Sequence, residues 1–472
     1  MGLDDLTRLS IAEAGDQIRR RSLSPVELTR AYLNRIQRTN GEFLAYITVL
    51  EEHAMAAAST AEHEITRGTY RGPLHGIPIA LKDLVLTRGV RTTCGSRILK
   101  DWVPSADGTV AIRLHEAGAI LLGKLNMHEF AYGPTGVNPH YGTARNPWDR
   151  TRVPGGSSSG SGAAVAAGLC AGALGTDTGG SVRIPAALCG IVGLKPTYGR
   201  VSRAGVIPLA WSLDHVGPMT RTVADTALML QALAGRDPAD PSTADVVVPD
   251  YRAALEKGVR GLCVGLPKDL FFERVDPEVR NAVLAAAQLI EDLGASVQEI
   301  ALPAISHANA ASFAIITAES TAYHEGYLKT RAAEYGADVR ARLVTGQFVL
   351  ATQYLKAQRA RRAIRAEVDA ALTRVDAFLT PTTPIPAPLL DTRELTLDGH
   401  TEDVRGWLTR CTRPINVTGH PALSVPCRLT VGGLPVGLQI VGRYFDEATV
   451  LRIGHAFEAV SPMKGRWPPE VA

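Results

Sequence analysis

This sequence lacks a charge excess, closely paired cysteines and long apolar runs, and each absence excludes a class of protein. Its 50 lysines and arginines nearly balance 47 aspartates and glutamates, and a net charge of only +3 gives no excess that favours nucleic-acid binding. The six cysteines form no CxxC pair, so the sequence predicts reduced thiols rather than a zinc or disulfide framework. No apolar run reaches the about 20 residues of a membrane-spanning helix. We therefore expect a cytoplasmic protein with neither a membrane segment nor a nucleic-acid partner.

Two local stretches support the same exclusions. The first residues, MGLDDLTRLS, are acidic and polar where a secretory signal is apolar, so we expect no signal peptide. The most basic stretch, KAQRARRAIR (356–365), distributes its cations around an alanine-rich helical pattern. A solvated helix face explains this pattern better than a nucleic-acid patch does.

The length of 472 residues allows up to about three domains at roughly 150 residues each. However, no linker, charge block or repeat separates the chain into parts, so the sequence favours one large domain with insertions.

Local patterns predict the fold class. Two capping boxes, Ser10 with Glu13 and Ser24 with Glu27, begin N-terminal helices. Apolar runs at 76–83 and 118–126 flank a helical stretch, and residues 261–302 predict a β-α-β unit. A hairpin that turns at 432–433 and a final helix over 447–460 complete the pattern. The sequence therefore predicts an α/β fold whose central mixed sheet is covered by helices on both faces.

Three short motifs suggest chemistry, but each lacks a required feature. GSSSG (156–160) would make Ser158 the nucleophile of a hydrolase elbow, but prolines and glycines precede it where the elbow needs a strand. GAILLGK (118–124) is followed by leucine where a phosphate-binding loop needs Ser or Thr. His128 and Glu129 begin a zinc motif whose second histidine is replaced by Tyr132, so we expect no metal site.

The glycine- and serine-rich stretch from 153 to 190 contains no histidine. Within it, AAVAAGLCAGALG (163–175) predicts a small-residue helix suited to close packing. TDTGGS then places Gly179 and Gly180 immediately before Ser181, and successive glycine amides can form an anion-binding nest. Because acyl transfer needs such a nest for its oxyanion, Ser181 is a better nucleophile candidate than Ser158. These residues alone do not identify the group that takes its proton.

Taken together, longer motifs resemble those of the amidase signature family, and the resemblance covers most of the chain. They are GIPIALKD (76–83), GGSSSGSGAAVAAG (155–168), GTDTGGSVRIPAALCGIVGLKPTYGRVS (175–202), SLDHVGPMTRTVAD (212–225), RPINVTGHPALSVPC (413–427) and GLPVGLQIVG (433–442). The resemblance implies a single amidase domain over 1–472. Within it we expect a helical N-terminal segment (1–70), a signature core with the catalytic residues (71–225) and a helix-rich, pocket-forming insertion (300–410).

The resemblance also implies a Ser-cisSer-Lys triad and no cofactor. Matched by motif, the nucleophile is Ser181, the bridging serine with a cis peptide is Ser157, and the base is Lys82. The implied oxyanion hole consists of the backbone amides of Thr178, Gly179, Gly180 and Ser181. The implied supporting residues are Ser158, Asp177 and Arg183.

A lysine base must be neutral, although a free lysine has a pKa near 10.4. Lowering this pKa to roughly 7 requires about 4 to 5 kcal/mol of destabilisation of the charged form, which burial can supply. The apolar run 77–81 before Lys82 is suited to carrying the lysine into such a place.

Several functions remain open at this level. The triad implies hydrolysis of a small-molecule amide or carbamate, with carbamate cleavage (urethanase activity) as the alternative to amide cleavage. A second branch of the family is the glutamine-hydrolysing component of glutaminyl-tRNA amidotransferase, which releases ammonia from glutamine. Leu84, GPTGVNPHYG (133–142) and Thr409, which replaces an acid that binds the glutamine amino group, depart from that branch and favour a stand-alone amidase. A non-catalytic scaffolding member is disfavoured because all three triad positions are present.

The residues that contact substrate are harder to predict. Tyr132, Trp211, SFAIITAES (312–320) and loops near Cys411 suggest a partly aromatic, apolar pocket, although the same residues also fit a plain core. The sequence leaves the oligomeric state open, a homo-oligomer included.

Overall fold

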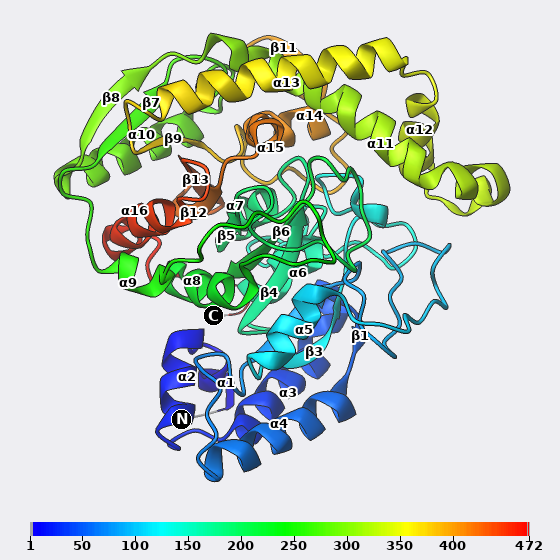
Figure 1. The fold of residues 1–472 in the computed structure, drawn as a ribbon, viewed down its shortest axis with the longest axis vertical. Helices are drawn as coiled ribbons and strands as arrows, with labels where there is room; N and C mark the ends of the chain where they lie inside the picture. The colour runs from blue at the N-terminus through cyan, green and yellow to red at the C-terminus, as the bar shows by residue number, and fades with distance from the viewer. Residues whose placement is uncertain (1–2, 470, 472) are drawn as a thin grey trace.

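The computed structural model describes residues 3–469 and 471. Its central feature is an 11-stranded mixed sheet with the order β1-β3-β2-β4-β6-β5-β12-β13-β9-β7-β8 (Figure 1). The strands are β1 (Tyr46–Val49), β2 (Pro78–Lys82), β3 (Ile120–Leu125), β4 (Gly172–Asp177), β5 (Val192–Lys195), β6 (His215–Thr220), β7 (Cys263–Pro267), β8 (Ser296–Ile300), β9 (Ala377–Pro381), β12 (Ala422–Leu429) and β13 (Pro435–Gly442). A separate two-stranded ribbon pairs β10 (Glu394–Leu397) with β11 (His400–Asp403). The predicted α/β fold with a mixed sheet is confirmed.

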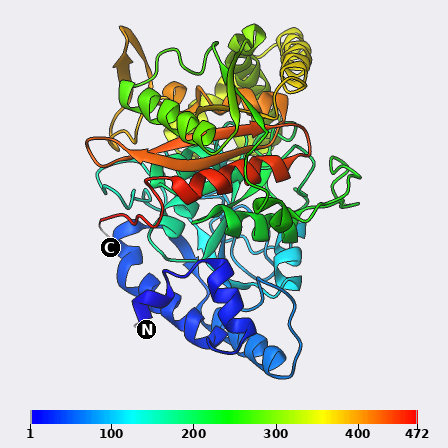
Figure 2. The same cartoon turned by 90° about the vertical axis from the view of Figure 1, so that its left-hand side faces the viewer.

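Helices surround this sheet, and those from the first part of the chain form one end of the molecule (Figure 2). The helices are α1 (Leu3–Leu6), α2 (Ile11–Arg19), α3 (Pro25–Phe43), α4 (Glu51–Thr66), α5 (Thr109–Glu116), α6 (Ser159–Ala166), α7 (Arg183–Cys189), α8 (Val223–Leu233), α9 (Tyr251–Leu255), α10 (Pro277–Asp292), α11 (Ala308–Arg331), α12 (Ala337–Gly346), α13 (Ala351–Ala371), α14 (Val404–Thr409), α15 (Arg413–Thr418) and α16 (Glu447–Val460), with short 3₁₀ helices at Glu129–Ala131, Pro303–His307 and Ala332–Glu334. Within the described residues, no helix is long and apolar enough to cross a membrane.

Alternation along β12 shows that helices cover both faces of the sheet. A Cβ atom added to Gly437 of β13 would meet Ala187 of α7 and the neighbouring Ser424 of β12. A Cβ added to Gly454 of α16 would instead meet Leu423 and Val425, the two residues that flank Ser424. Because successive strand residues point to opposite faces, α7 and α16 pack on opposite sides of the sheet.

Several local predictions agree with the structure. Strands β7 and β8 are parallel and are joined through α10, β12 and β13 form the predicted hairpin, and the last helix is α16. Two predictions were wrong in part. The small-residue helix over 163–175 ends at Ala166, because the segment from Gly172 becomes β4, a strand buried between β2 and β6.

The second capping box is also incomplete. Ser24 caps α3 by accepting hydrogen bonds from the amides of Val26 and Glu27, but its own hydroxyl donates to Glu62 of α4. The first box, Ser10 with Glu13, forms as predicted. A tertiary contact to α4 thus replaces the local pair at Ser24.

Candidate active site

Lys82 is the last residue of β2, and Asp177 is the last residue of β4. The two strands are parallel neighbours, so their carboxyl ends meet at the same edge of the sheet. The sequence places a lysine at the end of one strand and TDTGGS at the end of the other. The topology therefore brings together two motifs that lie far apart in the chain.

Lys82 is fully buried and makes two side-chain contacts. Its Nζ lies 2.7 Å from the hydroxyl oxygen of Ser157 and 2.8 Å from that of Thr176. Burial lowers the pKa of Lys82 to about 7, against the attraction of Asp177 and Asp214. A substantial fraction of this amine is therefore neutral near pH 7 and can accept a proton.

Ser157 and Ser158 precede helix α6. The peptide bond between Gly156 and Ser157 is cis, as the family resemblance implied. The Ser158 hydroxyl lies 3.3 Å from both the amide nitrogen and the carbonyl oxygen of Thr176. It thus connects the serine loop to the end of β4 and makes no contact with Lys82 among the described residues.

Ser181 precedes α7 and is 8% exposed, enough to face a cavity. The loop before it requires glycine at position 180, where φ is +128° and a Cβ would lie 2.2 Å from the Thr412 hydroxyl. Thr412 also donates a hydrogen bond of 2.7 Å to the carbonyl of Gly179. The loop is therefore held from the α15 side.

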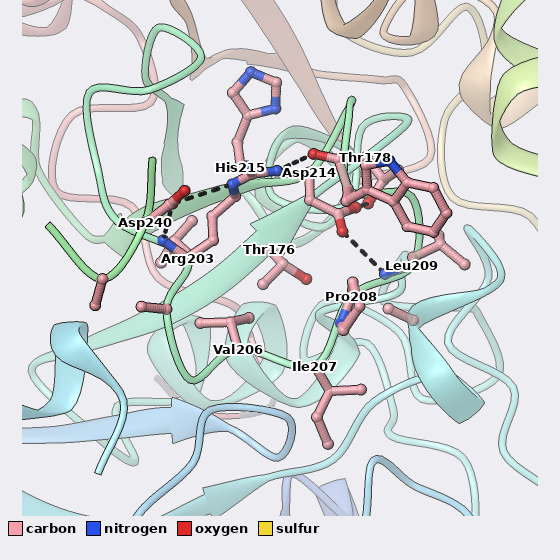
Figure 3. Close-up of a pocket in the computed structure, with 15 residues that line it drawn as sticks. Thr176, Thr178, Arg203, Val206, Ile207, Pro208, Leu209, Asp214, His215 and Asp240 are labelled. Atoms are coloured by element: carbon pink, nitrogen blue, oxygen red, sulfur yellow. Dashed lines mark hydrogen bonds and ion pairs between the residues drawn. The ribbon is translucent and has the colours of Figure 1, made fainter. Parts of the chain in front are cut away.

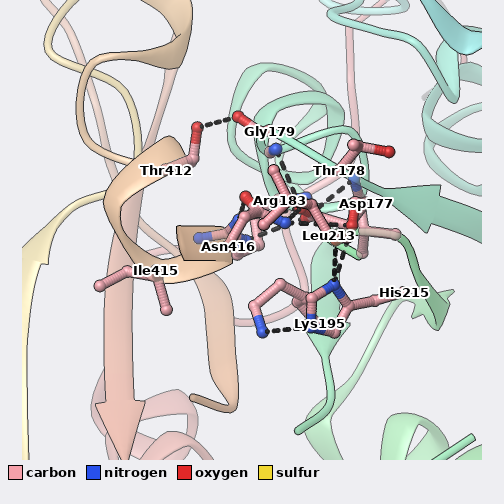
Figure 4. A network of polar contacts seen from close by, with 12 residues as sticks. Asp177, Thr178, Gly179, Arg183, Lys195, Leu213, His215, Thr412, Ile415 and Asn416 are labelled. Carbon is pink, nitrogen blue, oxygen red and sulfur yellow. Dashed lines mark hydrogen bonds and ion pairs between the residues drawn. The ribbon is translucent and has the colours of Figure 1, made fainter. Parts of the chain in front are cut away.

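A buried network fixes this loop from below (Figure 4). Arg183 donates two hydrogen bonds of 2.9 Å to the Asp177 carboxylate, and its remaining donors reach Asn416 and Gln439, both at 2.7 Å. Asn416 also donates to the Asp177 carboxylate at 2.8 Å. Burial alone would raise the pKa of Asp177, but the Arg183 guanidinium outweighs it and holds this pKa well below its usual range. The carboxylate thus remains charged and rigidly placed.

His215 and Lys195 complete the network. The His215 Nδ1 donates to the Leu213 carbonyl at 2.7 Å, which makes Nε2 the acceptor for Lys195 at 3.3 Å. Burial lowers the pKa of both groups well below their usual ranges. Neither side chain lines the cavity that contains Ser181, although His215 lines the neighbouring one.

Not all four predicted oxyanion donors are free. The Gly180 amide donates a hydrogen bond of 2.9 Å to the Asp177 carboxylate and is therefore occupied inside the loop. Within the described residues, no acceptor takes the amides of Thr178, Gly179 and Ser181. These three remain available to a ligand oxygen.

Ser181 opens into a cavity of about 240 Å³ between the loop and helices α11, α12, α14 and α15. Tyr132, one predicted pocket residue, lines it, and so do Phe313, Ile316 and Thr317 from the predicted segment 312–320. Cys411 is buried and lies outside it, although Thr409 and Arg413 on either side contribute to its wall. The lining combines an apolar wall with a cluster of charges, Arg342, Asp403, Arg405 and Arg413.

Trp211, the other predicted pocket residue, is 45% exposed and lines a second cavity of about 240 Å³ (Figure 3). This cavity shares Ala131 and Leu209 with the first and reaches Thr176 and Thr178. Asp214 anchors its wall, since it accepts hydrogen bonds from Thr178 and from the amide of Leu209. Burial raises the pKa of Asp214 to about 6.

Sequence reasoning missed Thr176, Arg342, Arg413 and Asn416. Thr176 had a detectable signal, because it directly precedes Asp177 at the end of β4 and alternation places the two side chains on opposite faces. Arg413 also had one, since a cation at the start of a helix, directly before a proline, is unusual in a buried segment. Arg342 and Asn416 lie on helices far from the motifs, and only the fold brings them near Ser181 or Asp177.

Comparison with known proteins identifies relatives over nearly the whole chain. A model of the family described as Amidase matches residues 27–451. The A component of the glutamyl-tRNA(Gln) amidotransferase from Geobacter metallireducens is 46% identical over 479 residues, which cover 96% of this chain and 97% of that protein. A solved vestigial protein complex, described as revealing the origins of an s-triazine catabolic enzyme, has a TM-score of 0.93 at 36% identity and covers 96% of this chain and 98% of its own. A bacterial aryl acylamidase has a TM-score of 0.88 at 28% identity, with 97% and 99% covered.

Proposed function

This chain belongs to the amidase family, and we propose that it is a stand-alone serine hydrolase that cleaves carboxylic amide C–N bonds. The observation that carries the proposal is the 2.7 Å contact between the buried Lys82 amine and the Ser157 hydroxyl. With a pKa of about 7, this amine can accept a proton at neutral pH, which a serine relay without histidine requires.

In the proposed reaction, the Ser181 oxygen attacks the carbonyl carbon of the amide. Its proton passes to Ser157, whose own proton passes to neutral Lys82. The amides of Thr178, Gly179 and Ser181 donate hydrogen bonds to the resulting oxyanion. In this proposal backbone amides, and not a charged side chain, stabilise the oxyanion.

The protonated relay then gives its proton to the leaving nitrogen as the C–N bond breaks, and an amine or ammonia departs. Water attacks the acyl-enzyme while the relay again accepts a proton, and the carboxylate product leaves with Ser181 restored. No step needs a metal or an organic cofactor. In this proposal the core (71–225) supplies the relay, the insertion (300–410) supplies much of the cavity wall, and the N-terminal segment (1–70) is scaffold.

Hydrolysis of glutamine for a transamidation partner is the second candidate, because the Geobacter metallireducens relative is named as a component of such an amidotransferase. The cavity argues against it. Thr409, at the position where that branch has an acid for the glutamine amino group, lines the wall together with Arg342 and Arg405. The one carboxylate of the wall, Asp403, is already paired with Arg405, so the described lining offers no free acid to an α-ammonium group.

The proposal is tested by following aniline release from a matched anilide, carbamate and ester, alongside ammonia release from glutamine, with the wild type and Ser181→Ala. We expect Ser181-dependent cleavage of the anilide. Cleavage of the carbamate alone would make this a urethanase, and ammonia from glutamine alone would favour the transamidation role. Anilide turnover that persists in Ser181→Ala would rule out the relay.

A further inference from the structure

Arg413 lies directly beside the loop that contains Ser181. It is the first residue of α15 and lines the Ser181 cavity. Its side chain runs along Gly179, because a Cβ atom added to that glycine would lie 3.3 Å from Arg413 Cγ and 3.7 Å from its Nε. The Nε side of the guanidinium is thus beside Gly179, one of the three residues whose amides are free to bind an oxyanion.

No group of the protein neutralises this guanidinium directly. Within residues 3–469 and 471, Arg413 has no ion pair or hydrogen bond, and its buried Nε has no acceptor. Burial lowers the pKa of Arg413 below its usual range, although a guanidinium remains charged at any physiological pH. Arg413 is only partly exposed, and a cation that has lost much of its water without gaining a partner is costly, so an anionic ligand would stabilise it.

The other two arginines of the cavity differ in this respect. Arg405 forms a bidentate pair with Asp403 and also contacts Asp338. Arg342 pairs with Asp338 and lies 4.7 Å over the Tyr132 ring. Their charges are balanced by direct contacts, and Arg413 alone among the three retains its donors for something that enters the cavity.

We infer that the substrate carries a carboxylate close to the scissile carbonyl, and that Arg413 binds it. This rests on the proposed function and names its substrate class: the monoamide of a short dicarboxylic acid. A guanidinium is suited to this because its planar donors match the two carboxylate oxygens. The proximity of Arg413 to Gly179 requires a short spacer between the carboxylate and the carbonyl, and Phe313 and Ile316 offer apolar contact to its methylenes.

The kinetic test compares glutaramate with pentanamide, which have carbon chains of the same length but differ in the terminal carboxylate. In the wild type we expect kcat/KM for glutaramate to exceed that for pentanamide by roughly tenfold or more, the scale of one charge-assisted contact. Arg413→Gln should abolish this preference. Arg340→Gln, a change on the exposed face of α12, should keep it. Equal turnover of the two amides by the wild type would overturn the inference, and so would an equal loss for both in Arg413→Gln.

A binding measurement gives an answer even if neither amide is hydrolysed. Glutarate, the dicarboxylate product, is titrated calorimetrically into the wild type, Arg413→Gln and Arg340→Gln. We expect a Kd that rises roughly tenfold or more in Arg413→Gln only. An absence of glutarate binding, or binding that Arg413→Gln leaves unchanged, would contradict the inference.

The two proposals fail in different ways. Ser181-dependent hydrolysis of a neutral anilide without any carboxylate preference would leave the amidase proposal standing and remove the anion site. Glutarate binding through Arg413 without any Ser181-dependent hydrolysis would do the reverse. Thermal unfolding shows whether a loss of activity or binding in Arg413→Gln comes from misfolding. Because the substitution removes a charge that has no partner, the Tm of Arg413→Gln should equal or exceed that of the wild type.

Discussion

The Nζ atom of Lys82 lies 2.7 Å from the hydroxyl oxygen of Ser157, although the two residues are 75 positions apart in the chain. Both side chains are fully buried, so the contact is shielded from water. In such surroundings the direction of the hydrogen bond depends on the protonation of the lysine: the charged form donates to Ser157, and the neutral amine accepts from it. The pKa of Lys82 therefore decides at which pH the proposed relay can begin.

The first prediction concerns the pH dependence of wild-type activity. Because burial lowers the pKa of Lys82 to about 7, the neutral base is lost as the pH falls below that value. We expect kcat/KM to fall about tenfold for each pH unit below it, as for a single essential base. Rates of anilide cleavage between pH 5 and 9 test this, and a flat profile over the range would exclude Lys82 as the base.

Lys82→Met provides the control and a second readout. The unfolded chain keeps the Lys82 proton up to a pH near 10.5, whereas the folded protein releases it near 7. Between these values the unfolded state binds more protons, so this group makes stability rise with pH from 7 to 10.5. Lys82→Met should be inactive at every pH and should lose this part of the rise, as measured by urea unfolding.

The second prediction separates the serines of the GGSSSG segment. Ser157→Ala should lower kcat by about 10² to 10⁴, the range for loss of a proton-transfer group. Ser159→Ala is the matched control, since its hydroxyl has only a 3.5 Å contact to the Asn126 carbonyl. Near-normal turnover by Ser157→Ala, with circular dichroism unchanged, would remove the bridging serine from the mechanism.

These predictions use residues that the sequence already suggested, and the reason is local. Lys82, Ser157 and Ser181 lie in motifs whose spacing is visible, and the apolar run before Lys82 predicted its burial. The strand at 172–177 was mistaken for helix because small residues pack equally well in either state, and only its place between β2 and β6 selects the strand.

Other parts of the site depend on contacts that a single sequence does not show. The occupied amide of Gly180 follows from the position of the Asp177 carboxylate, and Arg413 reaches Gly179 only because α15 packs on the loop. Trp211 lines the cavity that adjoins the Ser181 cavity, and its assignment to the substrate pocket remains a prediction.

The third prediction concerns stability. Arg183→Met leaves the fully buried Asp177 carboxylate without its bidentate partner, and loss of one member of a buried ion pair costs about 3 to 5 kcal/mol. The matched control is Arg236→Met, whose exposed pair with Asp245 contributes at most about 1 kcal/mol. Urea unfolding measures both, and equal effects would show that the network does not stabilise the fold.

The fourth prediction isolates Thr176, which Lys82 contacts at 2.8 Å and which no triad role includes. Thr176→Val keeps the shape of the side chain but removes an oxygen that accepts a hydrogen bond from Lys82. Loss of an acceptor disfavours the charged form more than the neutral one, because hydrogen bonds from charged groups are the stronger ones. The pKa of Lys82 should then fall further. The decline of kcat/KM on the acid side of the pH profile should therefore move to lower pH by about one unit.

Two further readouts decide whether Thr176 acts through Lys82. Thr176→Ser keeps the hydroxyl, so its kcat/KM should decline at the same pH as in the wild type. Thr176→Val should also lower kcat, because the Lys82 amine loses one of the two contacts that direct it at Ser157. If the threonine were purely structural, both variants would have a lower Tm, and the pH at which kcat/KM declines would not change. If the pH of this decline shifts in Thr176→Val but not in Thr176→Ser, and the two variants have equal Tm, Thr176 positions the proposed base.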